Sequence, residues 1–132
     1  MKNLLGILVL GLLWCNTSFA EWVYIYETSI SENGRNFNVK GYVDNSVKKK
    51  NGYVYAWTLL NFDKKTKYGE RSFLTHMQVD CDLSRAKDLQ VISKSGPMGS
   101  GNLIETYSDV GGWKASLPGT NIETKINKVC SF

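Results

Sequence analysis

The 132-residue sequence has one histidine, two prolines and three cysteines, and these small numbers narrow the chemistry open to it. A zinc site takes three or four protein ligands, and His76 has no second metal-type neighbour along the chain. No serine stands in the G-x-S-x-G context of a hydrolase nucleophile. The sequence therefore nominates no catalytic residue, no metal ligand and no cofactor site, and we expect a protein that is not an enzyme.

The sequence also lacks an apolar run long enough to cross a bilayer, which takes about 20 residues. Its apolar stretch from Leu4 to Trp14 follows Lys2 and precedes Ser18-Phe19-Ala20, with small residues at the first and third positions. This is the pattern of a secretory signal peptide that is cleaved after Ala20. We predict a signal peptide at 1–20 and one mature domain at 21–132, with no membrane-spanning segment left after cleavage.

Cleavage would leave two of the three cysteines, Cys81 and Cys130. Because an exported protein meets an oxidising compartment, an even pair predicts a disulfide, with two free thiols as the alternative. The bridge would close a loop of about 50 residues, which stabilises a fold by roughly 4 kcal/mol on a chain-entropy model. Cys15 follows Trp14 rather than a small residue, so we do not expect it to carry a lipid.

Positively charged residues are in small excess over negatively charged ones, which gives a net charge of +4 at pH 7. This falls short of the basic bias of a nucleic-acid-binding domain, and we expect no nucleic-acid partner. Two lysine runs lie in segments predicted as loops. If they meet at one edge of a sheet, they form a positive patch for a protein partner or an anionic polymer; otherwise they are solubilising loops. The candidate partner-binding residues are Lys48, Lys49, Lys50, Lys64, Lys65 and Lys67.

A glycine-rich stretch, "SKSGPMGSGN" at 93–102, raises the question of phosphate binding. A P-loop needs G-x-x-x-x-G-K-[ST] leading into a helix. Here no Lys-Ser/Thr pair follows Gly101, and the next residues, "LIETYS", are typical of an extended segment. Pro97, Gly99 and Gly101 instead suit a long connection between strands. We predict a structural loop.

Most of the chain after Glu21 has the composition of strands. Aromatic and β-branched segments are separated by turn formers, with Asn33-Gly34 the strongest hairpin signal. Asp44 or Ser46 is predicted to cap a single helical turn, and Asn51-Gly52 a further turn. "YVYAWTLLNF" is apolar on both faces, which favours a central strand. The expected strand segments are "EWVYIYETS", "FNVKGYVD", "YVYAWTLLNF", "RSFLTHMQVDC", "LQVIS" and a short "NLIETYS".

The end of the chain predicts irregular structure and then a helix. "DVGGWKASLPG" holds too much glycine and proline for a regular element. In "TNIETKINKVCSF", Thr120 and Glu123 have the spacing of a capping box. Ile122, Ile126 and Val129 recur at helical intervals. An amphipathic helix of about ten residues needs a docking partner to be stable, and a bridge from Cys130 would supply one.

Aromatic residues are plentiful and evenly spaced within two of the predicted strands. Tyrosines and tryptophans at alternate positions form a stripe on one face of a strand. We expect most of them to lie in the core under the helix, and any exposed remainder to form a binding face, because Tyr and Trp are enriched at interfaces. The two stripes are Trp22, Tyr24, Tyr26 and Tyr53, Tyr55, Trp57.

Several short landmarks resemble the surface-adhesin protein E family of small secreted bacterial proteins. They are Glu21-Trp22-Val23 at the start of the mature chain, "GYVYAWTLLNF", "SGPMGSG" after "VDC", Trp113 before Pro118-Gly119, and the closing Val129-Cys130. The resemblance covers 21–132. It implies an antiparallel sheet of about six strands, with a C-terminal helix held on it by one disulfide. It also implies adhesion to matrix proteins such as vitronectin and laminin.

The sequence thus predicts an exported α+β domain that binds another molecule without transforming it. The first hypothesis is a binding protein of the cell surface, outer membrane or periplasm that resembles surface-adhesin protein E. The alternative is a periplasmic inhibitor or envelope-accessory protein. Surface exposure distinguishes the two, since an adhesin must be reachable from outside the cell.

Overall fold

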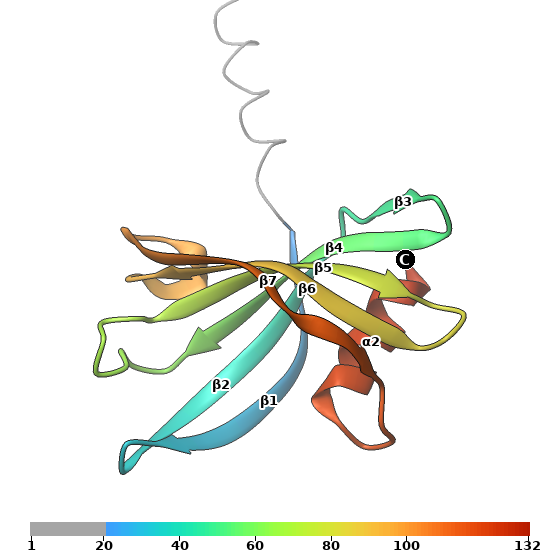
Figure 1. Ribbon diagram of the computed structural model, residues 1–132. Helices are drawn as coiled ribbons and strands as arrows, with labels where there is room; N and C mark the ends of the chain where they lie inside the picture. Colours follow the sequence, from blue (N-terminus) through green and yellow to red (C-terminus); the bar gives the residue numbers. More distant parts are fainter. Residues whose placement is uncertain (1–20) are drawn as a thin grey trace, which may run out of the picture.

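The computed structural model describes residues 21–132, apart from the side chain of Asp109, and the predicted signal peptide lies outside these residues. An antiparallel sheet with the order β1-β2-β4-β5-β6-β7 forms the body of the molecule, and the short β3 pairs with β4 beside this path (Figure 1). One C-terminal helix, α2, packs on the sheet. The expected α+β architecture is confirmed. The elements are β1 (Trp22–Glu32), β2 (Arg35–Asp44), β3 (Lys48–Lys50), β4 (Tyr53–Phe62), β5 (Ser72–Asp80), β6 (Arg85–Lys94), η2 (Pro97–Gly99), β7 (Leu103–Ala115) and α2 (Asn121–Ser131).

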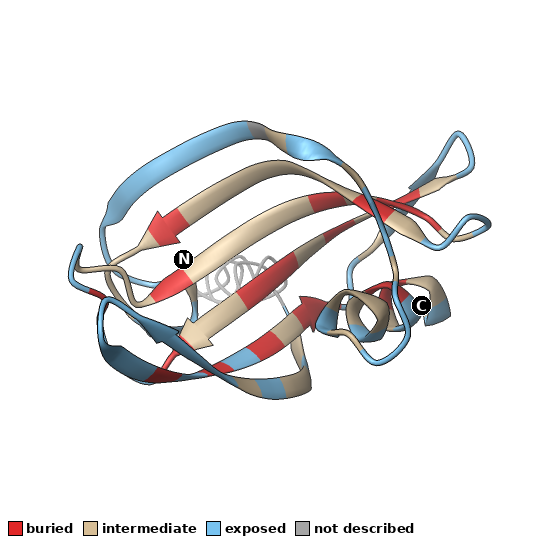
Figure 2. Cartoon of the chain, turned by 60° about the horizontal axis from the view of Figure 1, so that its bottom comes forward, coloured by how far each residue is buried: buried red, intermediate tan, exposed pale blue. Residues whose placement is uncertain are grey.

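The sheet is strongly curved and has two unlike faces. Figure 2 shows the strands bending round α2, which lies at one end of the curve. We call the face toward α2 the inner face; it carries the cross-strand pairs Val54–Val79 and Ala56–Met77. The opposite, outer face carries Tyr55 and the Trp57–His76 pair. The core is therefore built on the inner face, because side chains along a strand alternate between faces.

The helix begins at the predicted Thr120 cap, and the reciprocal bond of Glu123 is with Gly119 and not with Thr120. The Glu123 backbone N–H donates to Thr120 Oγ1 at 3.2 Å, and the Gly119 N–H donates to Glu123 Oε1 at 3.0 Å. Ile126 and Val129 are 1% and 0% exposed and close the inner core over Val43, Val79 and Ala86, among others. The cap fixes where the helix starts, and these two side chains fix which side of it faces the sheet.

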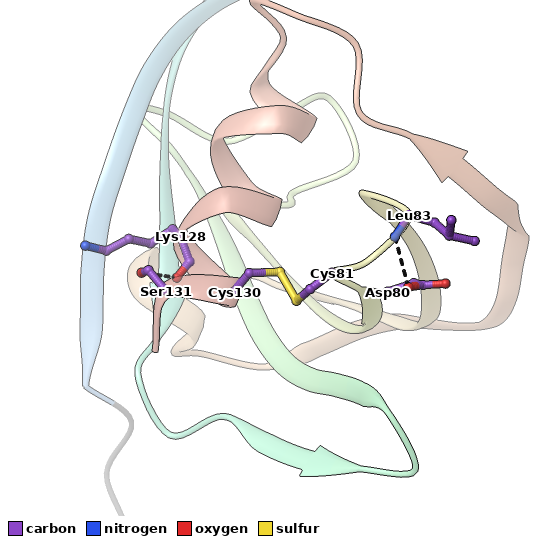
Figure 3. The surroundings of a disulfide bond; sticks show 6 residues. All are labelled: Asp80, Cys81, Leu83, Lys128, Cys130 and Ser131. Carbon is purple, nitrogen blue, oxygen red and sulfur yellow. Dashed lines mark hydrogen bonds between the residues drawn. A yellow bond between two sulfur atoms is a disulfide. The ribbon is translucent and has the colours of Figure 1, made fainter.

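The predicted disulfide joins Cys81, just after β5, to Cys130 in the last turn of α2, with Cα atoms 6.0 Å apart (Figure 3). Beside it, Asp80 accepts hydrogen bonds from the Leu83 backbone N–H and from Arg85 Nε. The Asp80 carboxylate thus holds the tight turn into β6. The bridge anchors the end of the helix to that same turn.

Burial lowers the pKa of Lys125 in α2, and Lys114 lowers it further, while Asp88 raises it. The folded lysine therefore binds its proton less tightly than the unfolded one. As pH rises from the lowered pKa toward the unfolded value of about 10.4, the unfolded state carries more protons and the free energy of unfolding increases. We expect Lys125→Met, which keeps the apolar stem, to abolish this increase. Urea unfolding of both proteins at about pH 7 and about pH 9.5 measures it, and an equal pH dependence in the two would contradict it.

Two segments differ from their sequence predictions. The predicted helical turn at Asp44 or Ser46 is wrong: the Ser46 N–H donates to Asp44 Oδ1 at 3.0 Å in a non-helical bend. The three lysines that follow form β3 instead of a loop. Asn51 and Gly52 have positive φ of 53° and 83°, which is the geometry of a two-residue hairpin, and such a turn needs strands on both sides.

The irregular segment predicted after Ser108 is also wrong, because β7 continues through both glycines to Ala115. The pairing with β6 shifts register between Ala86 and Asp88, which face Lys114 and Val110. Gly111, with φ of 82°, lies within this irregularity. The glycine therefore permits a bulge inside the strand and does not end it.

The glycine-rich loop is structural, as predicted, and it covers one end of the outer face. Ser72 is fully buried; its Oγ donates to the Gly96 carbonyl at 2.7 Å and accepts from the Gly99 N–H at 2.9 Å. The Met98 N–H donates to Asn61 Oδ1 at 2.7 Å. A Cβ at Gly101 would stand 2.6 Å from the Gly96 nitrogen. The glycines thus allow a tight loop to close over β4 and β5.

Candidate functional site

The aromatic stripe on β4 does not lie under the helix, so that prediction is wrong. Tyr53, Tyr55 and Trp57 alternate with the core residues Val54 and Ala56, and this alternation directs them to the outer face. All three are half-buried. Because the glycine-rich loop covers the other end of this face, the stripe is left open along the first half of β4.

The stripe predicted on β1 is divided between the two faces. A register shift between Tyr24 and Tyr26 places Tyr24 against Tyr42, with ring centroids 5.7 Å apart, while Tyr26 pairs with Gly41. One extra residue in a strand reverses the faces of all that follow it. Only a fold with paired strands reveals such a bulge, so spacing alone could not have shown it.

The two lysine runs lie at opposite ends of β4. Lys48 and Lys50 pair with Tyr55 and Tyr53, whereas 64–67 follows Phe62. At about 3.3 Å per residue the runs are separated by roughly 25 Å, so they do not form one patch. In the second run, Lys64 and Lys67 lie over aromatic rings, Phe37 at 5.5 Å and Tyr68 at 5.0 Å from the ring centroids.

The first run borders a hollow on the outer face. Its volume is about 420 Å³, within the usual range for small-molecule sites. The hollow brings two of the six candidate lysines together with the open aromatic stripe and the single histidine. The lining residues are Ser46, Lys48, Lys50, Tyr55, Trp57 and His76.

Trp57 and His76 form the wall of this hollow on β4 and β5. Their rings stack with centroids 4.7 Å apart and planes inclined by 17°. Burial lowers the pKa of His76, and the positive charge of Lys48 lowers it further. The imidazole is therefore neutral at pH 7, and it offers one hydrogen-bond donor and one acceptor beside two ammonium groups.

A second aromatic–cation group continues the outer face toward the sheet's far edge. Trp113 lies 5.7 Å from the Tyr53 ring, and the Arg85 guanidinium stands 4.4 Å from the Trp113 centroid. The Lys87 ammonium is 5.7 Å from the same ring. The outer face thus presents alternating cations and aromatic rings from β3 to β7, a composition that favours binding.

Sequence reasoning found Lys48 and Lys50 but considered His76 only as a metal ligand without a second neighbour. Nothing in the sequence showed that Trp57 would be its partner. That pairing depends on the register between β4 and β5. No group of three His, Cys, Asp or Glu side chains suited to a metal ion occurs within 21–132.

The described chain has no helix that is both long and apolar enough to span a membrane. No curated protein matches the sequence. The family model for surface-adhesin protein E matches residues 22–131, which includes every strand, the helix and the disulfide. The chain therefore belongs to the surface-adhesin protein E family.

Proposed function

We propose that this chain is exported and binds an extracellular protein through its outer face, at the end that β3 borders. The observation that carries the proposal is the combination of the family match with an uncovered face of aromatic rings and cations. Aromatic side chains supply contact area at small entropic cost, and lysines at the rim speed encounter with acidic surfaces.

The inner face is unsuited to this role where α2 covers it. Its side chains Val43 and Val79 are fully buried, as is Val129 of α2 that packs with them, so they offer nothing to a partner. The second lysine run lies at the far end of β4, away from the open stripe. We therefore assign partner binding to Lys48 and Lys50 before Lys64 and Lys67.

The first test is location. Full-length tagged protein on intact bacterial cells is treated with external protease, and the intact mass of the purified protein is recorded. We expect digestion from outside and a mass that corresponds to Glu21–Phe132 with one disulfide. Protection until the outer membrane is breached would instead support the periplasmic inhibitor or accessory protein and would contradict surface adhesion.

The second test is binding to immobilised vitronectin and laminin. We expect Lys48→Gln combined with Lys50→Gln to weaken binding at least about tenfold, because the outer face loses its rim charge. The matched control, Lys64→Gln with Lys67→Gln, removes the same charge at the far end of β4 and should change binding less than about twofold. Equal losses in both variants would show that net charge, rather than this face, governs binding.

A further inference from the structure

The two lysines and the stacked rings line different sides of the hollow on the outer face. Lys48 and Lys50 are exposed and lie on β3 at one side, while Trp57 and His76 lie on β4 and β5 at the other. Strand order places β3 and β5 on opposite sides of β4. Because His76 covers the indole on the β5 side, the uncovered indole face is on the side of the lysines. A ligand in the hollow therefore meets an aromatic plane and two cations together.

Neither lysine of the hollow takes part in an ion pair among the described side chains. Of the ion pairs formed by described side chains, one joins Arg85 to Asp80 and the other joins Lys114 to Asp88. Neither includes Lys48 or Lys50, so both ammonium groups are free to pair with an anion from outside. Charge-assisted hydrogen bonds from ammonium groups to a carboxylate are about twice as strong as neutral ones.

The polar groups around the indole suit hydroxyls. Ser46 contributes a hydroxyl and His76 a neutral imidazole, and each both donates and accepts. A flat apolar ring with hydroxyls at its rim is the complement of this arrangement. A pyranose in the β-gluco configuration has that shape, since its axial C–H bonds form an apolar face and its hydroxyls lie around the edge.

We infer that the hollow binds an acidic sugar residue, a pyranose that carries a carboxylate. The sugar ring packs on the free face of Trp57, the carboxylate pairs with Lys48 and Lys50, and ring hydroxyls bond Ser46 and His76. An acidic peptide would satisfy the lysines but would leave the indole without a flat partner. The inference rests on the proposed function, in which the outer face binds an extracellular protein. It names the bound group as an acidic glycan of that protein.

The test uses a matched pair of ligands and the protein 21–132 with its disulfide. Methyl β-D-glucuronide and methyl β-D-glucoside differ at one carbon, which is a carboxylate in the first and a hydroxymethyl in the second. Two-dimensional amide NMR follows each titration. We expect glucuronide to shift the Trp57 indole N–H and the amides of Lys48 and His76 saturably, with a dissociation constant on the order of 1 mM. The glucoside and sodium acetate should each bind at least about tenfold more weakly, because each lacks one half of the ligand.

Variants assign the binding to the hollow. Lys48→Gln with Lys50→Gln, and separately Trp57→Ala, should abolish saturation by glucuronide, whereas Lys64→Gln with Lys67→Gln should leave it unchanged. The same spectra report whether each variant is folded. Acetate shifts as large as those from glucuronide would show that charge alone is recognised, and tighter binding of a triglutamate peptide at the same amides would show a peptide site. Either result overturns the inference.

A final comparison separates this inference from the proposed function. Wild-type protein is tested on immobilised vitronectin and laminin before and after enzymatic removal of their acidic sugars, and against free polyglucuronate as competitor. We expect removal to reduce binding at least about tenfold. Binding that survives removal would retain adhesion and reject the sugar, whereas direct binding of polyglucuronate without any binding to vitronectin or laminin would retain the sugar site and reject the protein partner.

Discussion

Replacing both Cys81 and Cys130 with alanine should lower the free energy of unfolding by about 3–4 kcal/mol. The two residues are 49 positions apart, so the bridge closes a long loop and restricts the unfolded chain strongly. A domain of this size is stable by roughly 6–15 kcal/mol, so the variant should still fold, with a lower urea midpoint. The loss should appear first in α2.

The helix is the vulnerable element because only two of its side chains are fully buried. These are Ile126 at the centre of the helix and Val129 near its end. An isolated helix of this length is marginal in water. Amide hydrogen exchange should therefore show α2 opening before the strands of the sheet in the alanine variant.

Two controls define the effect of the bridge. Wild-type protein under reducing conditions should unfold at the urea concentration of the double variant. Ser131→Ala, a change of similar size next to Cys130 (Figure 3), loses one exposed hydrogen bond to the Lys128 carbonyl and should cost at most about 0.5 kcal/mol. A double variant as stable as wild type would show that the bridge contributes nothing to the fold.

Local signals in the sequence predicted the elements that are determined locally. Thr120 and Glu123 predicted the start of α2 because a capping box needs only neighbours along the chain. Asn33-Gly34 predicted the first hairpin for the same reason, and both residues have positive φ. The disulfide followed from the number of cysteines left after the predicted cleavage. None of these predictions required knowledge of which strands pair.

The sequence could not predict features that depend on strand pairing. The bulge before Tyr26 and the one at Gly111 exist because neighbouring strands differ in local length. The wrong prediction for the Tyr53–Trp57 stripe has a similar cause, since aromatic content does not say which face α2 covers. Val54 and Ala56 alternate with these aromatic residues along β4 and are smaller than they are. They form the core because the helix needs room to approach the sheet there.

In the candidate site, too, the sequence predicted some residues, while their neighbours depend on strand pairing. Lys48 and Lys50 were identified from charge, which is visible in the sequence. Their position beside Trp57 and His76 depends on two strand registers, that of β3 with β4 and that of β4 with β5. Charge alone therefore selected these lysines as candidates, while only the paired sheet places them beside an aromatic plane.

Gly41→Ala should destabilise the protein by about 1–3 kcal/mol, although alanine is ordinarily the better strand residue. The Tyr26 ring lies across Gly41 on the neighbouring strand, and a Cβ at residue 41 would stand 2.5 Å from Tyr26 Cζ. The methyl group would force the ring off its site. Burial raises the pKa of Tyr26, so displacement of the ring toward solvent should return that pKa toward about 10.

A double-mutant cycle tests whether the ring is the cause. When Tyr26→Ala has already removed the ring, Gly41→Ala should be neutral or slightly stabilising, which gives a coupling energy of about 2 kcal/mol between the two sites. Gly112→Ala is the matched control, because a Cβ there meets nothing within 4 Å and the residue lies within β7. Additive losses at the two sites would mean that Gly41 is required for its backbone alone. Strong coupling would show instead that the missing side chain of Gly41 leaves the space that the Tyr26 ring occupies.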